Sequence, residues 1–199
     1  MPIRGVIFDL DGTLVDSGLD FDVMRREMGL PAGQPILEAL AHLRGPQAER
    51  CRQILHEHEH AGARRATVLP GVRAFLNVLS DLGMAQAVVT RNCRSATLET
   101  LERLDLRFDP VVCREDAPVK PDPAAIHDIC RSWNVPTGQV AVIGDFWFDI
   151  QAGRQAGAKT AFFTRGRCLQ SSAAAVQPDF TFDSFLHTDA LLAWLTKSA

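Results

Sequence analysis

The stretch that decides the fold is Val6–Ser17, which reads VIFDLDGTLVDS. Its apolar, strand-forming start ends in two carboxylates, Asp9 and Asp11, and Gly12 and Thr13 follow at once. Residues i and i+2 of a strand share a face, so both aspartates are expected at the same edge of a sheet. Because Asp-Gly is also a common turn signal, the pair alone fits a turn or a helix cap as well.

Short apolar runs rich in Val, Ile and Phe alternate along the chain with amphipathic helical patterns. The predicted strands are Ile3–Leu10, Ala85–Thr90, Val111–Cys113, Val140–Ile143, Ala161–Phe163 and Phe180–Phe182. The predicted helices among them are Val72–Leu82, Ser95–Leu104, Pro123–Trp133, Asp149–Ala156 and Phe185–Leu195. Near-continuous hydrophobicity is typical of strands that are covered on both faces. The alternation therefore predicts an α/β fold with a doubly wound parallel sheet.

One segment interrupts this alternation. Between Asp20 and about Ala66 the sequence has helical patterns but no convincing strand; these patterns are Phe21–Met28, Pro35–His42 and Gln47–Gly62. We therefore predict a core made of residues 1–17 and 68–199, with a small helical cap at residues 18–67 inserted after the first strand.

The composition is that of a globular protein with ample material for a core: 46% of the 199 residues are hydrophobic and 23% are charged. The net charge of −3 gives no support for binding to nucleic acid or to a membrane surface. No apolar run is long enough to span a bilayer. Five scattered cysteines without a CxxC pair are typical of a reduced, cytoplasmic protein. The sequence carries no signal for an oligomeric state.

Further polar residues fall where predicted strands end or helices begin. Asp145 and Asp149 lie in VIGDFWFDI, after a strand. Thr90 ends a strand in VVTRN, and Lys120 precedes a helix in VKPDP. Ligands of such sheets bind beyond the carboxyl ends of the strands, so Asp9, Thr90 and Asp145 are expected at one edge. Taken singly, Asp145 and Asp149 fit a helix N-cap and an acidic first turn equally well.

In this order the segments resemble the four motifs of the haloacid dehalogenase-like hydrolase superfamily, and in particular its phosphoglycolate phosphatase-like members. The stretch DLDGTLVD is similar to the first motif. The resemblance implies a Rossmann-like core, Asp9 as the nucleophile and Asp11 as the general acid and base. It places Thr90 and Lys120 at the phosphoryl-binding positions. Since dehalogenases generally lack the second aspartate of this motif, Asp11 favours phosphoryl transfer over halide release.

The acidic residues also predict a metal. Four carboxylates that converge on one lysine leave a site with about three negative charges, which requires a cation, and Mg²⁺ prefers oxygen ligands. We expect Asp9 and Asp145 as direct ligands together with the backbone carbonyl of Asp11, and Asp149 as a ligand directly or through water. The predicted protein is a Mg²⁺-dependent phosphatase that hydrolyses a small phosphorylated metabolite through an aspartyl-phosphate.

Three other interpretations remain open at this point. A phosphosugar mutase of the same superfamily uses the same aspartates but returns the phosphoryl group to a bound intermediate. A receiver-type signalling module also combines an aspartate, a threonine and a lysine around Mg²⁺, although its phosphorylated aspartate lies in the middle of the domain. A non-catalytic descendant that binds a partner would not need all of these residues.

Two positions depart from the usual motifs. Phe146 and Trp147 follow Asp145 where Ser or Thr is frequent, which puts the usual hydrogen bonds around the metal ligands in doubt. Arg91 stands where a small or amide residue is common, with Asn92 after it. Arg91 and Asn92 are candidate substrate-binding residues. An ion pair with an acidic residue is an equally good interpretation of Arg91.

Two further sets of side chains lie in the inserted segment. Arg25 and Arg26 are candidate substrate contacts, although a solvated helix face explains them at least as well. His56 and His60, in the HEHEH stretch, are one helical turn apart, as in many metal sites. Because the sequence indicates no third ligand, a polar helix face is the better interpretation.

Overall fold

The computed structural model describes residues 2–166 and 177–197. Six strands form a parallel sheet in the order β5-β4-β1-β6-β7-β8. These strands are β1 (Gly5–Phe8), β4 (Ala85–Val89), β5 (Val111–Val112), β6 (Val140–Gly144), β7 (Lys159–Phe163) and β8 (Phe180–Phe182). From the central β1 the chain winds outward to β5 on one side and, starting again at β6, to β8 on the other. This order confirms the predicted α/β fold with its doubly wound sheet.

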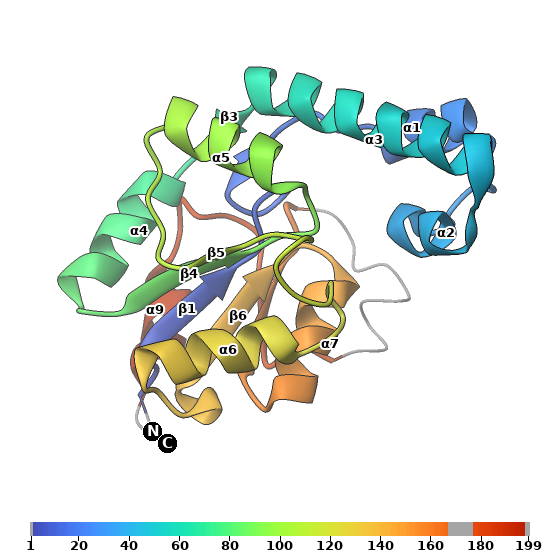
Figure 1. The fold of residues 1–199 in the computed structure, drawn as a ribbon. Helices are drawn as coiled ribbons and strands as arrows, with labels where there is room; N and C mark the ends of the chain where they lie inside the picture. The colour runs from blue at the N-terminus through green and yellow to red at the C-terminus, as the bar shows by residue number, and fades with distance from the viewer. Residues whose placement is uncertain (1, 167–176, 198–199) are drawn as a thin grey trace.

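Helices cover both faces of this sheet (Figure 1). One layer contains α6 (Ala124–Trp133) and α7 (Trp147–Ala156), which η1 (Thr137–Gln139) and β6 separate in the chain. The other contains α4 (Val72–Asp81) and α9 (Asp189–Thr196). The alternation along β1 explains the two layers, because Val6 and Phe8 pack with α4 and α9 whereas Ile7 packs with α6. All three side chains are fully buried, and each such burial stabilises the fold by roughly 1.5–3 kcal/mol.

Three helices form the inserted segment: α1 (Phe21–Met28), α2 (Ile36–His42) and α3 (Gly45–Arg65). We call them the inserted helices. They share an apolar cluster of their own, formed by Met24, Met28, Ile36, Leu40, Cys51 and Leu55. The helix α3 is longer than the predicted Gln47–Gly62. The division of the chain into a core and a cap stays a prediction.

A short two-stranded ribbon, which sequence patterns did not indicate, brackets the inserted helices. β2 (Val15–Asp16) pairs antiparallel with β3 (Thr67–Val68), so the chain leaves and re-enters the core at one place. Two residues per strand are too few for a detectable alternation of apolar and polar side chains. On the side of α3, the Arg65 side chain donates to the backbone carbonyls of Ser17 and Gly18.

The helix predicted at Phe185–Leu195 begins at Asp189 instead. Phe185 lies in a turn and is buried, with its ring centroid 4.8 Å from that of Phe163 and 5.0 Å from that of Phe182. The turn passes so close to Gly71 that a Cβ atom there would lie 2.3 Å from the carbonyl oxygen of Phe185. Tertiary packing of the ring thus overrides the local helical pattern.

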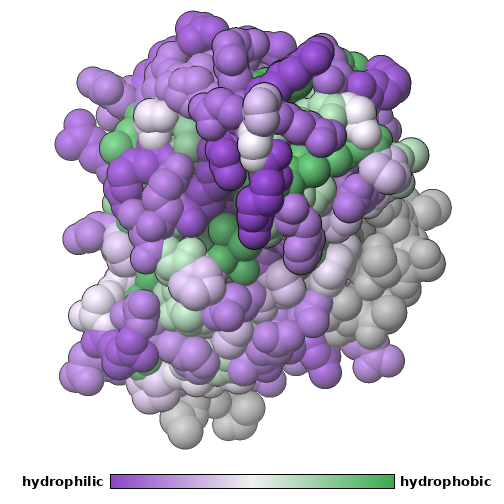
Figure 2. Space-filling view, turned by 45° about the vertical axis from the view of Figure 1, so that its right-hand side comes forward, coloured by the Kyte–Doolittle hydropathy of each residue, from purple (hydrophilic) through white to green (hydrophobic). Residues whose placement is uncertain are grey.

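The surface of the described part of the chain is mainly polar. Figure 2 shows a largely hydrophilic face on which hydrophobic groups gather in an interrupted band across the middle. Within residues 2–166 and 177–197, no helix combines the length and the apolar character needed to cross a membrane. The described cysteines, Cys51, Cys93, Cys113 and Cys130, are all free and buried, and Cys168 lies outside the described residues.

Candidate active site

The register of the sheet brings the predicted site residues to one edge. Phe8, the last residue of β1, pairs with Val88 of β4 and with Ile143 of β6. Asp9 directly follows Phe8, and Thr90 and Asp145 lie two residues beyond Val88 and Ile143, so all three emerge at the same edge of the sheet. Asp9 is held there by its backbone N–H, which donates to the carbonyl of Ile143 at 3.0 Å.

Lys120 is the centre of the charged cluster at this edge. Its Nζ lies 2.6 Å from Oδ1 of Asp9 and 2.6 Å from Oδ1 of Asp149, and it donates to the backbone carbonyl of Val89 at 2.6 Å. Only 4% of Lys120 and 2% of Asp149 are exposed. Three acceptors thus use the three N–H donors of the ammonium group, which fixes the position of both carboxylates.

Burial and charge together set the ionisation of the pair. Burial would lower the pKa of Lys120, but the carboxylates of Asp149 and Asp9 raise it above its ordinary value. Burial raises the pKa of Asp9 well above its ordinary value; Lys120 opposes this, and the carboxylates of Asp149 and Asp145 add to it. The site therefore holds more negative charge than one lysine can compensate, which makes it a place for a further cation.

Asp11 has a different environment. Its Oδ2 accepts a hydrogen bond from the side-chain amide of Asn92. Burial raises the pKa of Asp11, and hydrogen bonds from Ser17 and Asn92 lower it by less. Thr90 lies next to Asn92 and is 4% exposed, and its Oγ1 accepts the backbone N–H of Asn92 at 3.2 Å. A carboxyl group with a raised pKa is suited to carry a proton as well as to accept one.

Two glycines allow the remaining carboxylates to approach. A Cβ atom on Gly12, whose φ is +86°, would lie 2.3 Å from Oδ2 of Asp145, and one on Gly144 would lie 2.3 Å from Asp149. Thr13, which is fully buried, donates from Oγ1 to Oδ1 of Asp145 at 3.2 Å. The DGT triplet therefore both clears space for Asp145 and orients it.

Three of these carboxylates are arranged as ligands of a metal ion. Asp9, Asp145 and Asp149 each offer an oxygen, and the three oxygens lie within 4.8 Å of one another. Hard carboxylate oxygens are the donors that Mg²⁺ prefers, so these residues fit the predicted ion.

Two hydrogen bonds orient the carboxylates of Asp145 and Asp149. Thr13 holds Asp145, and the backbone N–H of Phe146 donates to Oδ2 of Asp149 at 3.1 Å. Phe146 itself is 44% exposed, and Trp147 opens α7 beside it. Both carboxylates therefore have hydrogen-bond donors that do not depend on a Ser or Thr side chain after Asp145.

Arg91 forms a polar contact between this edge and the inserted helices. Its Nη2 donates to Oε1 and Oε2 of Glu38 in α2, at 2.8 and 2.7 Å. Its Nη1 donates to the backbone carbonyl of Lys120, and its guanidinium carbon lies 4.1 Å from the ring centroid of Phe148. Of the two interpretations of Arg91, the structure contains the one in which it pairs with an acid.

The other predicted substrate contacts lie among the inserted helices. Arg25 donates to Asp22 at 2.6 Å and to the carbonyl of Gln34 at 3.4 Å, and Arg26 is exposed on the same helix. A contact of Arg25 or Arg26 with a substrate stays a prediction. Sequence reasoning missed Glu38 altogether, because no spacing relates a residue in α2 to one that follows β4.

Comparison with known proteins places these features in a family. Residues 6–163 match the model of the family described as haloacid dehalogenase-like hydrolase. A plasmid-encoded phosphoglycolate phosphatase of Cupriavidus necator is 30% identical over 219 residues, covering 96% of this chain and 94% of the relative. A haloacid dehalogenase-like hydrolase domain-containing protein of Arabidopsis thaliana is 29% identical over 205 residues, covering 96% and 84%. A hydrolase from Pseudomonas syringae has the same fold, with a TM-score of 0.80 at 22% identity, covering 98% and 100% of the two chains.

Proposed function

The chain belongs to the haloacid dehalogenase-like hydrolase family, and we propose that it is a Mg²⁺-dependent phosphatase of a small phosphorylated metabolite. One observation carries the proposal: Asp9, Asp145 and Asp149 converge within 4.8 Å while buried Lys120 binds two of them. Such a site attracts a divalent cation and, with it, a phosphate dianion. The phosphatase names of relatives support the same reaction class.

In the first half-reaction Asp9 is the nucleophile. Because Lys120 binds Oδ1 of Asp9, we assign the attack on phosphorus to Oδ2. A bond forms between this oxygen and phosphorus while the bond from phosphorus to the substrate oxygen breaks. The product is an aspartyl-phosphate, so that one difficult hydrolysis becomes two easier steps. We assign the binding of the non-bridging oxygens to Thr90 Oγ1 and to the Lys120 ammonium, which would exchange its hydrogen bond to the Val89 carbonyl for one to the phosphate.

Asp11 transfers the proton in both halves of the reaction. Its raised pKa allows it to give a proton to the departing substrate oxygen. It then takes a proton from the water that attacks phosphorus, which breaks the acyl-phosphate bond, releases inorganic phosphate and regenerates the Asp9 carboxylate. The hydrogen bond from Asn92 orients the Asp11 carboxyl group for this role.

We assign the metal to Asp9, Asp145, Asp149 and the backbone carbonyl of Asp11. When bound, Mg²⁺ supplies positive charge that screens the repulsion between the Asp9 carboxylate and the phosphate. The protein's own part is to hold these ligands: Thr13 orients Asp145, and Lys120 orients Asp9 and Asp149.

We further propose that the inserted helices form a cap that selects the substrate. Glu38 in α2 binds Arg91, whose neighbours Thr90 and Asn92 belong to the proposed phosphate and proton-transfer machinery. A cap in this position excludes water from the site and contacts the part of the substrate that leaves.

Phosphate release from a panel of phosphorylated metabolites, with Mg²⁺ or with a chelator, tests the proposal. We expect metal-dependent turnover in the wild type and a loss of at least about 10³-fold in Asp9→Asn, since removal of a nucleophile abolishes covalent catalysis. Asp81→Asn is the matched control, because Asp81 is exposed at the end of α4. Acid quenching should trap one labile phosphoryl group per wild-type chain and none in Asp9→Asn.

The outcomes separate the phosphatase from the other interpretations. Turnover that persists in Asp9→Asn contradicts the nucleophile assignment. Isomerised sugar phosphate without free phosphate indicates a mutase. A phosphoryl group that stays on the chain for minutes, without turnover, indicates a receiver module.

A further inference from the structure

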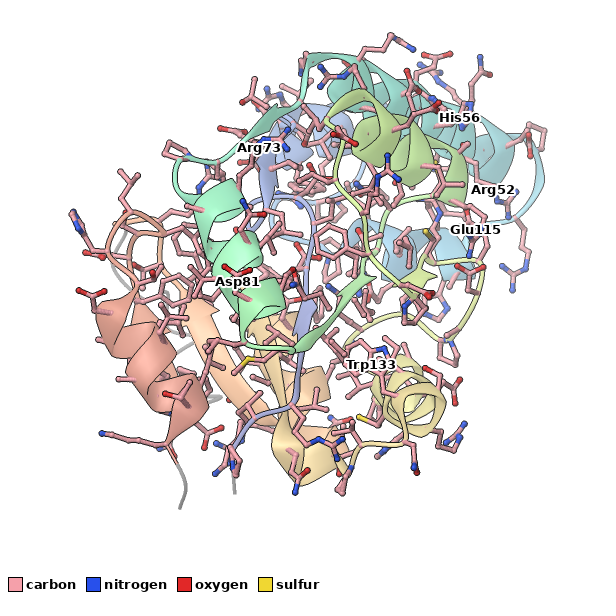
Figure 3. The ribbon with its side chains drawn as sticks, turned by 90° about the vertical axis from the view of Figure 1, so that its left-hand side faces the viewer. Arg52, His56, Arg73, Asp81, Glu115 and Trp133 are labelled. Carbon is pink, nitrogen blue, oxygen red and sulfur yellow. The ribbon has the colours of Figure 1, made fainter. Side chains whose placement is uncertain are left out.

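A second group of side chains able to bind a metal ion lies where α3 of the inserted helices meets α5 (Arg94–Arg103). The two helices approach closely because small side chains, Ala63 of α3 and Ala96 of α5, pack there with Cys93. Figure 3 labels His56 on α3, in the region beside α5. Cys93 is the residue that precedes α5, so its thiol faces α3 from the end of the helix.

His56, His60 and Cys93 come together at this contact. Each offers one ligand atom, and the three atoms lie within 4.8 Å of one another. The two imidazole centroids are 4.4 Å apart, as expected for residues separated by one helical turn. The sequence did not indicate this third candidate ligand, because Cys93 lies 37 positions after His56 in the chain and approaches it only in the folded structure.

The hydrogen bonds of His60 orient it as a ligand. Nδ1 of His60 lies 2.8 Å from Oε2 of Glu99, and Nε2 lies 3.0 Å from Oγ of Ser95. An ionised carboxylate only accepts hydrogen bonds, so in the neutral ring Nδ1 carries the proton and the lone pair is on Nε2. A carboxylate behind the far nitrogen is the usual companion of a histidine that binds a metal.

We propose that His56, His60 and Cys93 form a binding site for one Zn²⁺ ion, separate from the carboxylate cluster at the sheet edge. Two imidazoles and a thiolate are the donors that Zn²⁺ prefers, whereas Mg²⁺ prefers oxygen. Three protein ligands leave the fourth tetrahedral position to water. When Zn²⁺ binds, the Cys93 thiol loses its proton to solvent and binds the ion as a thiolate.

The geometry requires only a small closure. Tetrahedral bonds of usual length place ligand atoms roughly 3.3–3.6 Å apart, compared with the 4.8 Å limit of the present group. His56 is exposed on α3 and can change rotamer without disturbing the core. The Ser95 hydroxyl, now at Nε2 of His60, moves aside as the ion binds.

Such an ion would connect two parts of the chain that the catalytic proposal assigns to different roles. His56 and His60 belong to the inserted helices, whereas Cys93 follows Asn92, whose amide binds Asp11. Bound Zn²⁺ would therefore fasten α3 to the loop that carries Thr90 and Asn92. The binding itself does not depend on the proposed phosphatase activity.

Titration with Co²⁺, in the presence of excess Mg²⁺ to occupy the carboxylates, tests this site. A thiolate ligand produces a near-ultraviolet sulfur-to-cobalt charge-transfer band, which carboxylate ligands cannot produce. We expect one equivalent of Co²⁺ to saturate the band and Zn²⁺ to abolish it by displacement. Cys93→Ser should abolish the band, and Cys113→Ser, which replaces another buried thiol, should retain it.

Zinc affinity, measured by competition with a chromophoric chelator, tests the imidazoles. His56→Gln should weaken binding at least tenfold, and Glu99→Gln should weaken it by about 10–100-fold through the orientation of His60. His58→Gln is the matched control in the same stretch, because His58 binds Glu27 instead, at 2.7 Å. Since His56 is exposed, its variant tests the site even if Cys93→Ser fails to fold.

The proposal is overturned if the charge-transfer band never appears, or if it persists in Cys93→Ser. It is overturned equally if His56→Gln and His58→Gln bind zinc alike. Co²⁺ that binds without the band and is displaced by Mg²⁺ would belong to the carboxylate cluster alone, which also overturns the proposal.

Discussion

The guanidinium of Arg91 donates to both carboxylate oxygens of Glu38, at 2.8 and 2.7 Å, and so ties the loop after β4 to α2. The same side chain donates to the carbonyl of Lys120 and stacks over Phe148. One arginine thereby contacts the inserted helices, the segment of the buried lysine, and α7. Lysine could not reproduce these contacts, because its ammonium group lacks the planar fork of N–H donors that a guanidinium provides.

The first prediction concerns the strength of this tie. In a double-mutant cycle of Arg91→Met and Glu38→Gln, we expect a coupling of about 0.5–1 kcal/mol in the free energy of unfolding, because Glu38 is partly exposed to solvent. Arg91→Met alone should cost about 1–2 kcal/mol, since it also loses the carbonyl and the ring of Phe148. Urea denaturation measures both quantities.

The control for this cycle is an exposed pair within α3. Arg52 and Glu49 lie 3.3 Å apart, with side chains that are 57% and 79% exposed. Solvent screening should leave them a coupling of no more than a few tenths of a kcal/mol. If the Arg91–Glu38 coupling is no larger than this, the contact does not hold α2 in place.

The second prediction separates the two tasks assigned to Asp11. Nitrophenolate leaves without needing a proton, whereas an alkoxide needs one. In Asp11→Asn, the first turnover of p-nitrophenyl phosphate should therefore remain fast while hydrolysis of the aspartyl-phosphate slows by about 10²–10⁴-fold. Rapid-mixing measurements should show a burst of one nitrophenolate per chain, followed by slow turnover. Equal slowing of both phases would contradict the proton-transfer role.

The third prediction concerns the close approach of Gly12 to Asp145. In Gly12→Ala the new Cβ would lie 2.3 Å from Oδ2 of Asp145, in a backbone conformation with φ +86°. We expect turnover and Mg²⁺ affinity to fall by at least tenfold, with a loss of stability of about 1–2 kcal/mol. Isothermal titration with Mg²⁺ and thermal denaturation measure these effects.

Gly83→Ala is the matched control, because Gly83 has φ +69° but nothing within 4 Å of the added Cβ. It should lose a similar amount of stability through backbone strain and keep its Mg²⁺ affinity. Equal losses of Mg²⁺ affinity in both variants would show that general destabilisation, rather than the displaced carboxylate, causes the effect.

The sheet edge was predictable from sequence because a parallel strand places its next residue at a known position. Asp9, Thr90 and Asp145 each follow a strand that is mainly apolar, and the register then brings them together. The turn at Asp11–Thr13 was also predictable from sequence, although the hydrogen bond from Thr13 to Asp145 depends on the three-dimensional structure. The local sequence pattern thus determines which residues lie at this edge of the sheet.

Contacts between separate elements were beyond the reach of such patterns. Glu38 and Arg91 are 53 positions apart, and no periodicity connects them. Cys93 approaches His56 and His60 only because α5 packs on α3. The predicted start of α9 at Phe185 was wrong for a related reason, because the Phe185 ring packs against Phe163 and Phe182 in a turn that precedes the helix. Side-chain packing over long chain separations decides all three.

The last prediction follows from the raised pKa of Asp9, which burial causes and the carboxylates of Asp149 and Asp145 increase. A carboxyl group with a higher pKa in the folded state stabilises the fold while protonated. This stability is complete below the unfolded pKa, near 3.8, and is lost as the pH rises through the folded value. Each unit of difference corresponds to about 1.4 kcal/mol.

In the presence of a chelator, the unfolding free energy of the wild type relative to that of Asp9→Asn should therefore fall as the pH rises above 4. Asp9→Asn cannot ionise and keeps a hydrogen-bond acceptor for Lys120, so it should lack this fall and be the more stable protein at neutral pH. Asp81→Asn should follow the wild-type profile. Urea denaturation across this pH range measures the difference, and parallel profiles for wild type and Asp9→Asn would contradict it.

Saturating Mg²⁺ should reverse the order of stability at neutral pH, because only the wild-type carboxylate gains a metal partner. The residue that proposed catalysis requires would then be one that destabilises the metal-free fold.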